Sequence, residues 1–315
     1  MTNKINRILV TGGAGFIGSH TIDRLISQGR QVWVLDNLST GFLDNLAPHI
    51  SDGSVKFVQG DIGDQSLLNE LMGNVEAVIH LGALLDHEKC LRNPELADQV
   101  NHQGTLTLLE QARRHDLQRF VYASSAAVYG DVSRMPIAED CELAPLTPYG
   151  ASKLAGERKC VEYWRTHELR TICLRYFNVF GPRQSSRQYS GVITAFMKKL
   201  GQGQSPTIYG DGFQTRDFVH VSDVAAANIL ALDSERNGEV YNIASGMETT
   251  INSLAQNLID ISGQPSITPE CTSERQGEIR RSAADIQKAR TQLQYNPKTD
   301  LQENLTDLWN WFTQK

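Results

Sequence analysis

The fold is decided by the segment Ile8-Leu9-Val10-Thr11-Gly12-Gly13-Ala14-Gly15-Phe16-Ile17-Gly18. An apolar run leads into three glycines with the spacing G-x-x-G-x-x-G. Gly12 permits a tight turn, Gly15 lets the backbone approach a pyrophosphate, and Gly18 allows a helix to pack closely on a strand. The N-terminus of the helix after this turn would face the phosphates. The segment therefore predicts a strand–turn–helix unit that binds a dinucleotide.

The first half of the chain alternates short apolar runs with helical stretches. The run Val32-Trp33-Val34-Leu35 is continuously apolar, as expected for a strand that is buried on both faces. Such alternation predicts an α/β fold with a doubly wound parallel sheet of the Rossmann type. We expect strands at Ile5–Thr11, Gln31–Asp36, Val55–Gly60, Glu76–Leu81, Gln118–Ser124 and Thr171–Tyr176, and helices at Ile17–Gln28 and Asn93–Arg114.

The pattern loosens after Gly181, where short strands are expected at Pro206–Tyr209 and Val240–Ala244. A last helix at Leu301–Phe312 has apolar residues at helical spacing, which indicates a core face. We therefore expect a dinucleotide-binding domain of residues 1–180 and a smaller C-terminal α/β substrate lobe of residues 181–315, with some of the chain crossing back to the first domain.

Asp36 ends the second expected strand, about 20 residues beyond the glycines, where a carboxylate accepts hydrogen bonds from an adenosine ribose. A carboxylate would repel a 2′-phosphate, so NAD is favoured over NADP. The alternative is a structural turn followed by a strand-end aspartate. Asp61 could bind the adenine amine or serve in a turn. His80 fits a hydrogen-bonded core histidine better than a catalyst.

Tyr149 and Lys153 lie four residues apart at the start of an expected helix, which places the phenol and the ammonium on one face. A tyrosine with a pKa of about 10 is a poor base at neutral pH. A nearby ammonium and a positively charged nicotinamide would both favour the phenolate. Ser125 follows the fifth expected strand, at the sheet edge where ligands bind. Such a tyrosine–lysine pair is also common in ordinary helices, and it gains weight from the glycine segment.

Composition excludes several other classes of function. Thirty Lys and Arg against 36 Asp and Glu give a net charge of −6, which disfavours nucleic-acid binding. No apolar run is long enough to cross a membrane, and the cysteines and histidines lack the spacing of a metal site. Five scattered cysteines favour a reducing compartment. We expect a cytoplasmic protein that binds no metal, no nucleic acid and no membrane.

Four further stretches carry a resemblance: Ser124-Ser125-Ala126-Ala127-Val128-Tyr129-Gly130, Tyr149-Gly150-Ala151-Ser152-Lys153, 175–184 and 210–221. Together with the glycine segment, they resemble the extended short-chain dehydrogenase/reductase family. The last two stretches resemble its nucleotide-sugar branch, especially the UDP-hexose 4-epimerases. The resemblance covers nearly the whole chain.

The resemblance assigns roles to individual positions. It implies that Tyr149 is the base at the sugar 4-OH, that Ser125 hydrogen-bonds the same oxygen, and that Lys153 holds the nicotinamide ribose. The expected NAD-binding residues are Gly12, Gly15, Phe16, Ile17, Gly18, Asp36, Asn37, Ser39, Asp61, Ile62, Leu81, Gly82, Ala83, Asn101, Lys153 and Phe177. The expected substrate residues are Ser125, Tyr149, Asn178, Tyr209, Arg216, Arg275, Glu278 and Ser282, with the arginines at the diphosphate and Glu278 at a ribose hydroxyl.

The resemblance implies oxidation at C4 of the sugar, and neighbouring groups decide the fate of the 4-keto sugar. The dehydratases of this family have Asp-Glu directly after the Ser/Thr, whereas this chain has Ala126 and Ala127. Methyl groups transfer no protons, so 4-epimerisation of a UDP-sugar is expected. Open alternatives are another C4-oxidising enzyme (a uronate epimerase, a dehydratase or a reductase) and a non-catalytic NAD-binding regulator. The family also implies a homodimer formed through 93–114 and 149–167.

Ser282 stands where the family has a gating residue, which is bulky in strict hexose enzymes and small in those that accept N-acetylated sugars. A serine leaves room for an acetamido group, so UDP-GlcNAc and UDP-GalNAc are expected substrates beside UDP-glucose and UDP-galactose. Ser282→Tyr should abolish turnover of the N-acetylated pair and spare the simple hexoses, as measured by product formation from each sugar. Equal loss of both activities would contradict the gate.

Overall fold

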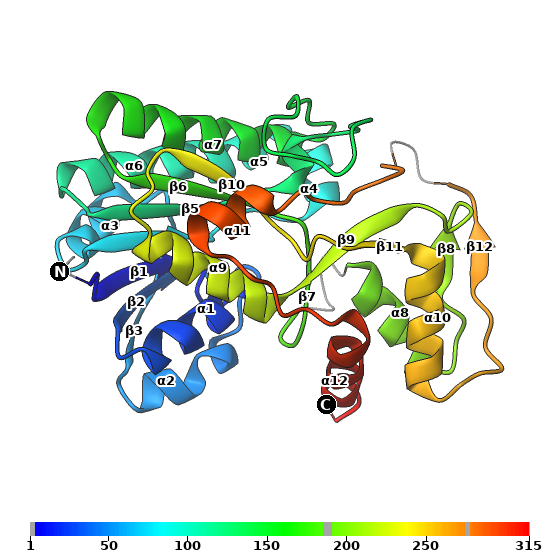
Figure 1. Cartoon of the computed structure of the whole chain (residues 1–315). Coiled ribbons are helices and arrows are strands. Elements are labelled where there is room, and N and C mark those ends of the chain that lie inside the picture. Colours follow the sequence, from blue (N-terminus) through cyan, green and yellow to red (C-terminus); the bar gives the residue numbers. More distant parts are fainter. Residues whose placement is uncertain (1–3, 185–190, 275–277, 315) are drawn as a thin grey trace.

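The central feature of the computed structural model is a seven-stranded parallel sheet (Figure 1). The structure describes residues 4–184, 191–274 and 278–314. Strand order is β10-β6-β5-β4-β1-β2-β3, so the winding direction reverses between β1 and β4. The strands are β1 (Arg7–Thr11), β2 (Gln31–Asp36), β3 (Val55–Gln59), β4 (Ala77–His80), β5 (Arg119–Ser125), β6 (Thr171–Tyr176) and β10 (Glu239–Ile243). The predicted doubly wound parallel sheet is confirmed.

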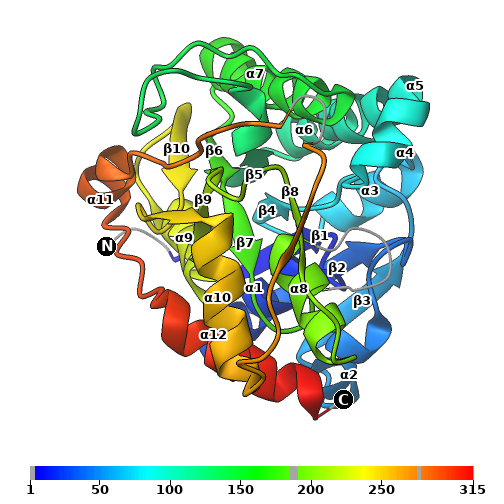
Figure 2. The ribbon, with the colours of Figure 1, turned by 90° about the vertical axis from the view of Figure 1, so that its right-hand side faces the viewer.

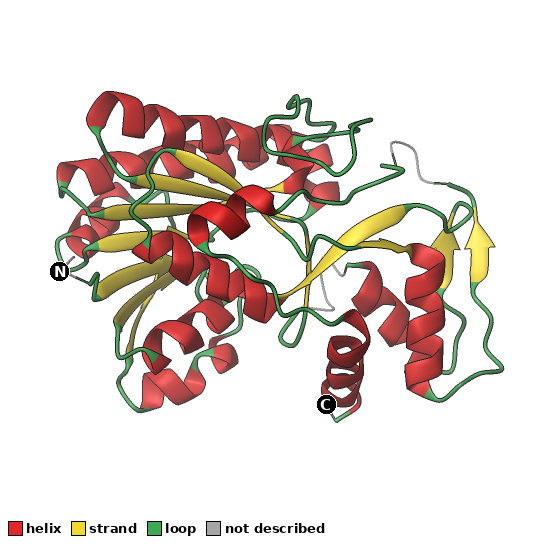
Figure 3. Cartoon of the chain, viewed as in Figure 1, coloured by secondary structure: helices red, strands yellow, loops and turns green. Residues whose placement is uncertain are grey.

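The expected strands lie close to their predicted positions. Those at Gln31–Asp36 and Thr171–Tyr176 have the predicted bounds, and the other six differ by one or two residues at one end or at both. Helices cover both faces of the sheet (Figure 3). Those on one face include α1 (Phe16–Ser27) and α9 (Val221–Asp233), and those on the other include α3 (Gln65–Met72), α6 (Gly104–Arg114) and α7 (Pro148–His167).

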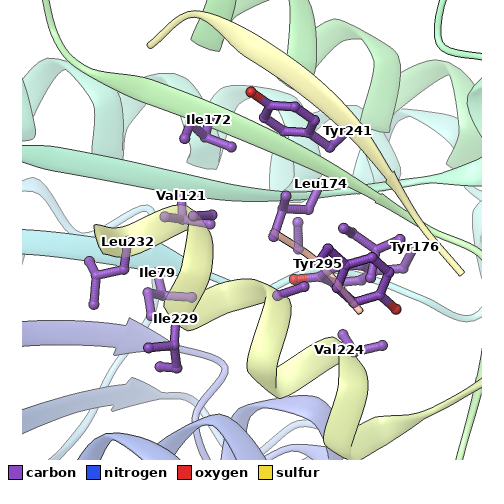
Figure 4. Close-up of a cluster of buried hydrophobic side chains, with 14 of the residues drawn as sticks. Ile79, Val121, Ile172, Leu174, Tyr176, Val224, Ile229, Leu232, Tyr241 and Tyr295 are labelled. Atoms are coloured by element: carbon purple, nitrogen blue, oxygen red, sulfur yellow. The ribbon is translucent and has the colours of Figure 1, made fainter. Parts of the chain in front are cut away.

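Alternate residues of each strand enter different halves of the core, which explains the continuous apolar runs. Ile8 and Val10 pack beneath α1 and α9, whereas Leu9 packs beneath α3 and α6, and all three are fully buried. Figure 4 shows the first half of the core, with Val224, Ile229 and Leu232 of α9 near Ile79, Val121, Ile172 and Leu174 of the sheet.

Two elements from the second half of the chain pack onto the large sheet and its helices, which the first half forms. Strand β10 adds to the sheet edge beside β6, and α9 packs against α1. Helix α11 (Gln287–Leu293) in turn packs against β10. The chain therefore crosses back to the large sheet after residue 181.

The remaining elements build a smaller unit with its own core. Helix α10 (Ile251–Ser262) contacts both α8 (Val192–Leu200) and α12 (Leu301–Thr313) (Figure 2). Leu305 and Leu308 are buried in this core, so the predicted core face of the last helix is confirmed. The unit has two small sheets, β11 (Glu248–Thr250) with β9 (Thr215–His220) and β7 (Asn178–Phe180), and β12 (Glu270–Thr272) with β8 (Thr207–Tyr209).

The continuous helix expected at Asn93–Arg114 is wrong in one respect. The stretch consists of α5 (Pro94–Asp98), a π-helical segment η2 (Gln99–Gln103) and α6. The wider turn brings Asn101 into the interior, and π-helical turns often mark functional positions. The shorter elements are η1 (Leu43–Asn45), α2 (Ala47–Ser51), α4 (His87–Arg92) and η3 (Ala126–Val128). Among the described helices, none is both long and apolar enough to cross a membrane.

Gly18→Ala should destabilise the protein, because a Cβ at this position would clash with the carbonyl oxygen of Gly12 in the preceding turn. Overpacking against backbone costs about 1–3 kcal/mol, measured as the free energy of unfolding in urea. Gly73→Ala is the matched control, since the nearest atom to its Cβ would be 3.7 Å away. The prediction fails if both variants unfold at the same urea concentration.

Candidate active site

The glycine turn lies where the strand order reverses. Gly12 has a φ of +67°, and a Cβ there would come within 2.7 Å of the backbone nitrogen of Gly82. The β1–α1 turn and the loop after β4 therefore meet with no room for a side chain. This edge of a doubly wound sheet is where dinucleotides bind, with the pyrophosphate at the N-terminus of the first helix. The cradle fits such a ligand.

Asp36 lies beside this turn at the end of β2. Its carboxylate accepts hydrogen bonds from the backbone N–H of Ala14 at 2.9 Å and of Leu38 at 2.8 Å. Burial raises the pKa of the Asp36 carboxyl above its usual range, although both hydrogen bonds oppose the shift. The acceptor expected at an adenosine ribose thus stands next to the glycine turn.

Several of the expected NAD-binding residues form a linked group at the ends of β2 and β3. Asn37 Nδ2 donates to Asp61 Oδ2 at 3.0 Å, and the backbone N–H of Ser39 donates to Asn37 Oδ1 at 3.0 Å. Asp61 Oδ1 accepts from the backbone N–H of Gly63 at 2.8 Å. Ile62 is buried against α6. Asp61 therefore makes the contacts of a turn residue, which is the alternative to its expected role at the adenine amine.

Asn101 ties the loop after β4 to helix α7. Its Oδ1 accepts from the backbone N–H of Leu84 at 2.7 Å, and its Nδ2 donates to Leu84 O and to Ser152 Oγ at 3.1 and 3.0 Å. This loop contains three of the expected cofactor residues, Leu81, Gly82 and Ala83. His80 lies below it, with its ring nitrogens hydrogen-bonded to Thr11 and Thr105. The interpretation of His80 as a core histidine agrees with these contacts.

Ser125, Tyr149 and Lys153 come from the end of β5 and the first turns of α7. The Thr147 hydroxyl caps this helix by accepting from the backbone N–H of Gly150 at 3.1 Å. A Cβ at Gly150 would lie 2.5 Å from Ala127 O, so the helix start is pressed against η3, next to Ser125. This close approach brings the tyrosine-bearing turn beside the serine-bearing strand end.

Lys153 is a buried ammonium. Its Nζ lies 4.4 Å from the ring centroid of Tyr122, and the residue is 3% exposed. Burial lowers the pKa of Lys153 to about 8. The group is therefore mostly protonated at neutral pH, because its pKa of about 8 lies above 7.

His87 contacts the candidate base and has no signal in the sequence. It begins α4, and its ring centroid lies 4.8 Å from that of Tyr149, at an angle of 40°. Burial lowers the pKa of His87, so the imidazole on this face of Tyr149 is neutral at neutral pH. Only the fold shows the contact, because 62 residues separate the two rings in the chain.

Apart from Ser125 and Tyr149, the expected substrate residues that the structure describes occupy the smaller unit and its border with the sheet. Arg216 forms an ion pair with Glu278 and donates to Ile279 O at 2.8 Å. Asn178 Nδ2 donates to Asp217 O at 3.4 Å. Tyr209 ends β8 and is 38% exposed, whereas Ser282 and Phe177, an expected cofactor residue, are buried. Arg275 lies outside the described residues.

The structure thus pairs Arg216 with Glu278, which were expected at different parts of the nucleotide. The described residues contain no cluster of three or more His, Cys, Asp or Glu side chains that could hold a metal ion.

The burial of Lys153 has a consequence for stability. Its pKa of about 8 lies below the ordinary value of 10.5, so between these pH values the unfolded chain holds a proton that the folded protein has lost. Stability contributed by this group therefore rises with pH through that window. Unfolding free energies of wild type relative to Lys153→Met should rise by up to about 3 kcal/mol from pH 7 to pH 10.5. A difference that does not change with pH would refute the buried charge.

Comparison with known proteins places these features in a family. The model of the NAD dependent epimerase/dehydratase family matches residues 8–244. A putative UDP-glucose 4-epimerase of Methanocaldococcus jannaschii is 41% identical and covers 96% of this chain and 97% of its own. A dTDP-glucose 4,6-dehydratase of Actinoplanes sp. is 37% identical, with 97% of each chain covered.

The fold also matches a solved structure of a similar protein. A UDP-N-acetylglucosamine 4-epimerase of Methanobrevibacter ruminantium superposes with a TM-score of 0.93 at 35% identity, covering 99% of both chains. The glycine turn, the acidic residue after β2 and the Ser–Tyr–Lys arrangement agree with this likeness. The chain belongs to the NAD-dependent epimerase/dehydratase family of extended short-chain dehydrogenases/reductases.

Proposed function

We propose that the chain catalyses 4-epimerisation of a UDP-sugar through a transient 4-keto sugar. The substrates would be UDP-GlcNAc/UDP-GalNAc, UDP-glucose/UDP-galactose or both pairs. NAD, when bound, supplies the redox chemistry by accepting the hydride of C4 and returning it. Residues 1–180 would hold NAD, and residues 181–315, together with Asn178, would hold the nucleotide sugar.

The observation that carries this proposal is the pair Ala126–Ala127 in η3, directly after Ser125. A 4,6-dehydration needs an acid and a base to eliminate water. Two methyl groups at this place supply neither, which favours epimerisation over dehydration despite the similarity to a dehydratase. The decarboxylase branch uses a nearby glutamate, and neither alanine provides one.

Three side chains would perform the proton transfer. Tyr149 takes the proton of the sugar 4-OH as C4 is oxidised, and it returns this proton when the ketone is reduced on its other face. The Ser125 hydroxyl donates a hydrogen bond to the same oxygen. Lys153 keeps a positive charge near the phenol, which favours the phenolate needed for the first step.

The smaller unit would bind the nucleotide and the sugar. Arg216 and Arg275 suit the diphosphate, since a guanidinium forms paired hydrogen bonds to phosphate oxygens. Tyr209 and Asn178 would line the same nucleotide, and Glu278 would accept from a ribose hydroxyl. Ser282 is 9% exposed, and its small side chain supports room for an acetamido group.

We also propose a cytoplasmic homodimer. The paired helices would be those of 93–114 and α7, and Leu91 and Leu146, near these helices in the chain, are 58% and 56% exposed. All five cysteines are free thiols, and four of them are buried. This supports a reducing compartment.

Purified protein without added NAD should convert UDP-sugars to their C4 epimers. Retained cofactor would make each cycle redox-neutral, so no external NAD is required. The measurement is an incubation with a panel of UDP- and dTDP-sugars, with products identified by NMR. A 4-keto-6-deoxy product would overturn the argument from Ala126 and Ala127.

Tyr149→Phe is the control for the mechanism. Loss of the phenol should lower kcat by about 10²- to 10⁴-fold, the usual contribution of a general base. NAD content of the purified variant should stay unchanged. Conversion at the wild-type rate would exclude Tyr149 as the base.

A further inference from the structure

A buried ion pair lies under the candidate active site. Glu157 of α7 and Arg175 of β6 have side chains that are each 4% exposed. Arg175 Nη2 donates to Glu157 Oε1 at 2.6 Å, and Arg175 Nε donates to Glu157 Oε2 at 2.9 Å. These two parallel hydrogen bonds fix both side chains in one geometry.

The Glu157 carboxylate connects β5 and α7, the two elements that carry the proposed catalytic residues. Ser124 Oγ donates to Glu157 Oε2 at 2.7 Å, and Ser124 directly precedes Ser125. Glu157 lies one helical turn beyond Lys153, as Lys153 lies one turn beyond Tyr149. Glu157 therefore links the end of β5 to the helix that carries the phenol and the ammonium.

The guanidinium end reaches the other side of the site. Arg175 Nη1 donates to the Tyr129 hydroxyl at 2.7 Å and to Glu139 O at 3.1 Å. The Tyr129 hydroxyl donates to Asn242 Oδ1 at 2.6 Å. The Tyr129 ring lies 6.4 Å from that of Phe177, an expected cofactor residue.

Asn242 extends the connection to the segment that carries Ser282. Its Nδ2 donates to Ile137 O at 2.9 Å and to Asp285 O at 3.1 Å. The backbone N–H of Ile137 donates to Ala283 O at 2.8 Å. The hydrogen-bonded path from Ser124 therefore ends at the residue next to the proposed gate.

We propose that the Glu157–Arg175 pair is a positioning element for the reaction, which fixes Ser125 and Lys153 relative to each other and to the Ser282 segment. This inference rests on the proposed function. A requirement for stability does not by itself explain the pair, because apolar side chains of the same volume often replace a buried ion pair without loss of stability.

The pair also acts on the charge of Lys153. Burial lowers the pKa of Lys153, and Cys160, Cys173 and the Glu157 carboxylate each raise it against that larger effect. The other titratable groups near this ammonium are Tyr122 of β5, His80 of β4, Cys173 of β6, and Tyr149 and Cys160 of α7. Among these groups, only Glu157 has a carboxylate that can offset the charge.

Three variants separate charge from position. Glu157→Gln leaves the Arg175 cation buried and should lower the pKa of Lys153, whereas Arg175→Met leaves the Glu157 anion and should raise it. The double variant carries neither charge, so the pKa should return toward that of wild type. NMR of isotope-labelled lysine reads this pKa, with Lys153→Met to identify the signal. This readout needs no substrate.

Kinetics with the nucleotide sugar test the positioning itself. Both single variants and the double variant should lower kcat on the order of 10- to 100-fold, as expected for a misplaced catalytic group, with KM changed far less. Ser124→Ala keeps both charges, so it should lower kcat without moving the pKa of Lys153. It also tests the proposal if the charge variants fold poorly.

Glu110→Gln is the matched control, because Glu110 forms a comparable doubly hydrogen-bonded pair with Arg113 on α6, with side chains that are 30% and 39% exposed. It should change neither kcat nor the pKa of Lys153. A purely structural pair would lower only the denaturation midpoint in the Glu157 and Arg175 variants, and that result would overturn the proposal. If wild type converts no nucleotide sugar, the proposed function fails, while the Lys153 titration still tests the electrostatic link.

Discussion

The structure around the candidate site depends on keeping one ammonium charged in the interior. Lys153 is fully enclosed, and burial lowers its pKa to about 8. Loss of the proton is opposed by Cys160, Cys173 and the Glu157 carboxylate, which raise the pKa of Lys153, and by the ring face of Tyr122. Tyr149, Lys153 and Glu157 follow one another at four-residue spacing, and all three are buried. Helix α7 therefore buries two charged side chains, Lys153 and Glu157, on the side that packs against β5 and β6, in addition to apolar residues such as Cys160 and Tyr163.

Local sequence patterns predicted the sheet and the cofactor side of the site. Gly12 and Asp36 belong to one strand–helix–strand unit. Their spacing along the chain is therefore sufficient to predict that they lie close together. The contact of His87 with Tyr149 and the pair of Glu157 with Arg175 join distant segments, and neither leaves a periodic signal. The π-helical turn at Asn101 was missed because hydrophobic spacing barely changes over five residues.

The substrate side was predictable only as a set of residue types. A cation cluster is needed to hold a diphosphate in an acidic protein, yet Arg216 already has a carboxylate partner in Glu278. The two side chains are only 17% and 19% exposed, so an anionic ligand would have to take the place of Glu278 for the Arg216 guanidinium to stay paired. Asp217, close in the chain, is different: it is fully buried and accepts hydrogen bonds from Ser245, Gly246 and Ala284. It fixes the backbone that surrounds Arg216 and cannot change partners.

The proposed reaction depends on which proton-transferring side chains lie at the end of β5 and in the first turn of α7. The end of β5 offers the Ser125 hydroxyl followed by two methyl groups, and the first turn of α7 offers one phenol. A dehydration moves protons at two carbons and needs separate groups to do so. An epimerisation needs one group that releases, on the return step, the proton it took at the start. A single phenol on the same helix face as a buried ammonium would meet that requirement, because the positive charge would favour the phenolate without itself entering the reaction.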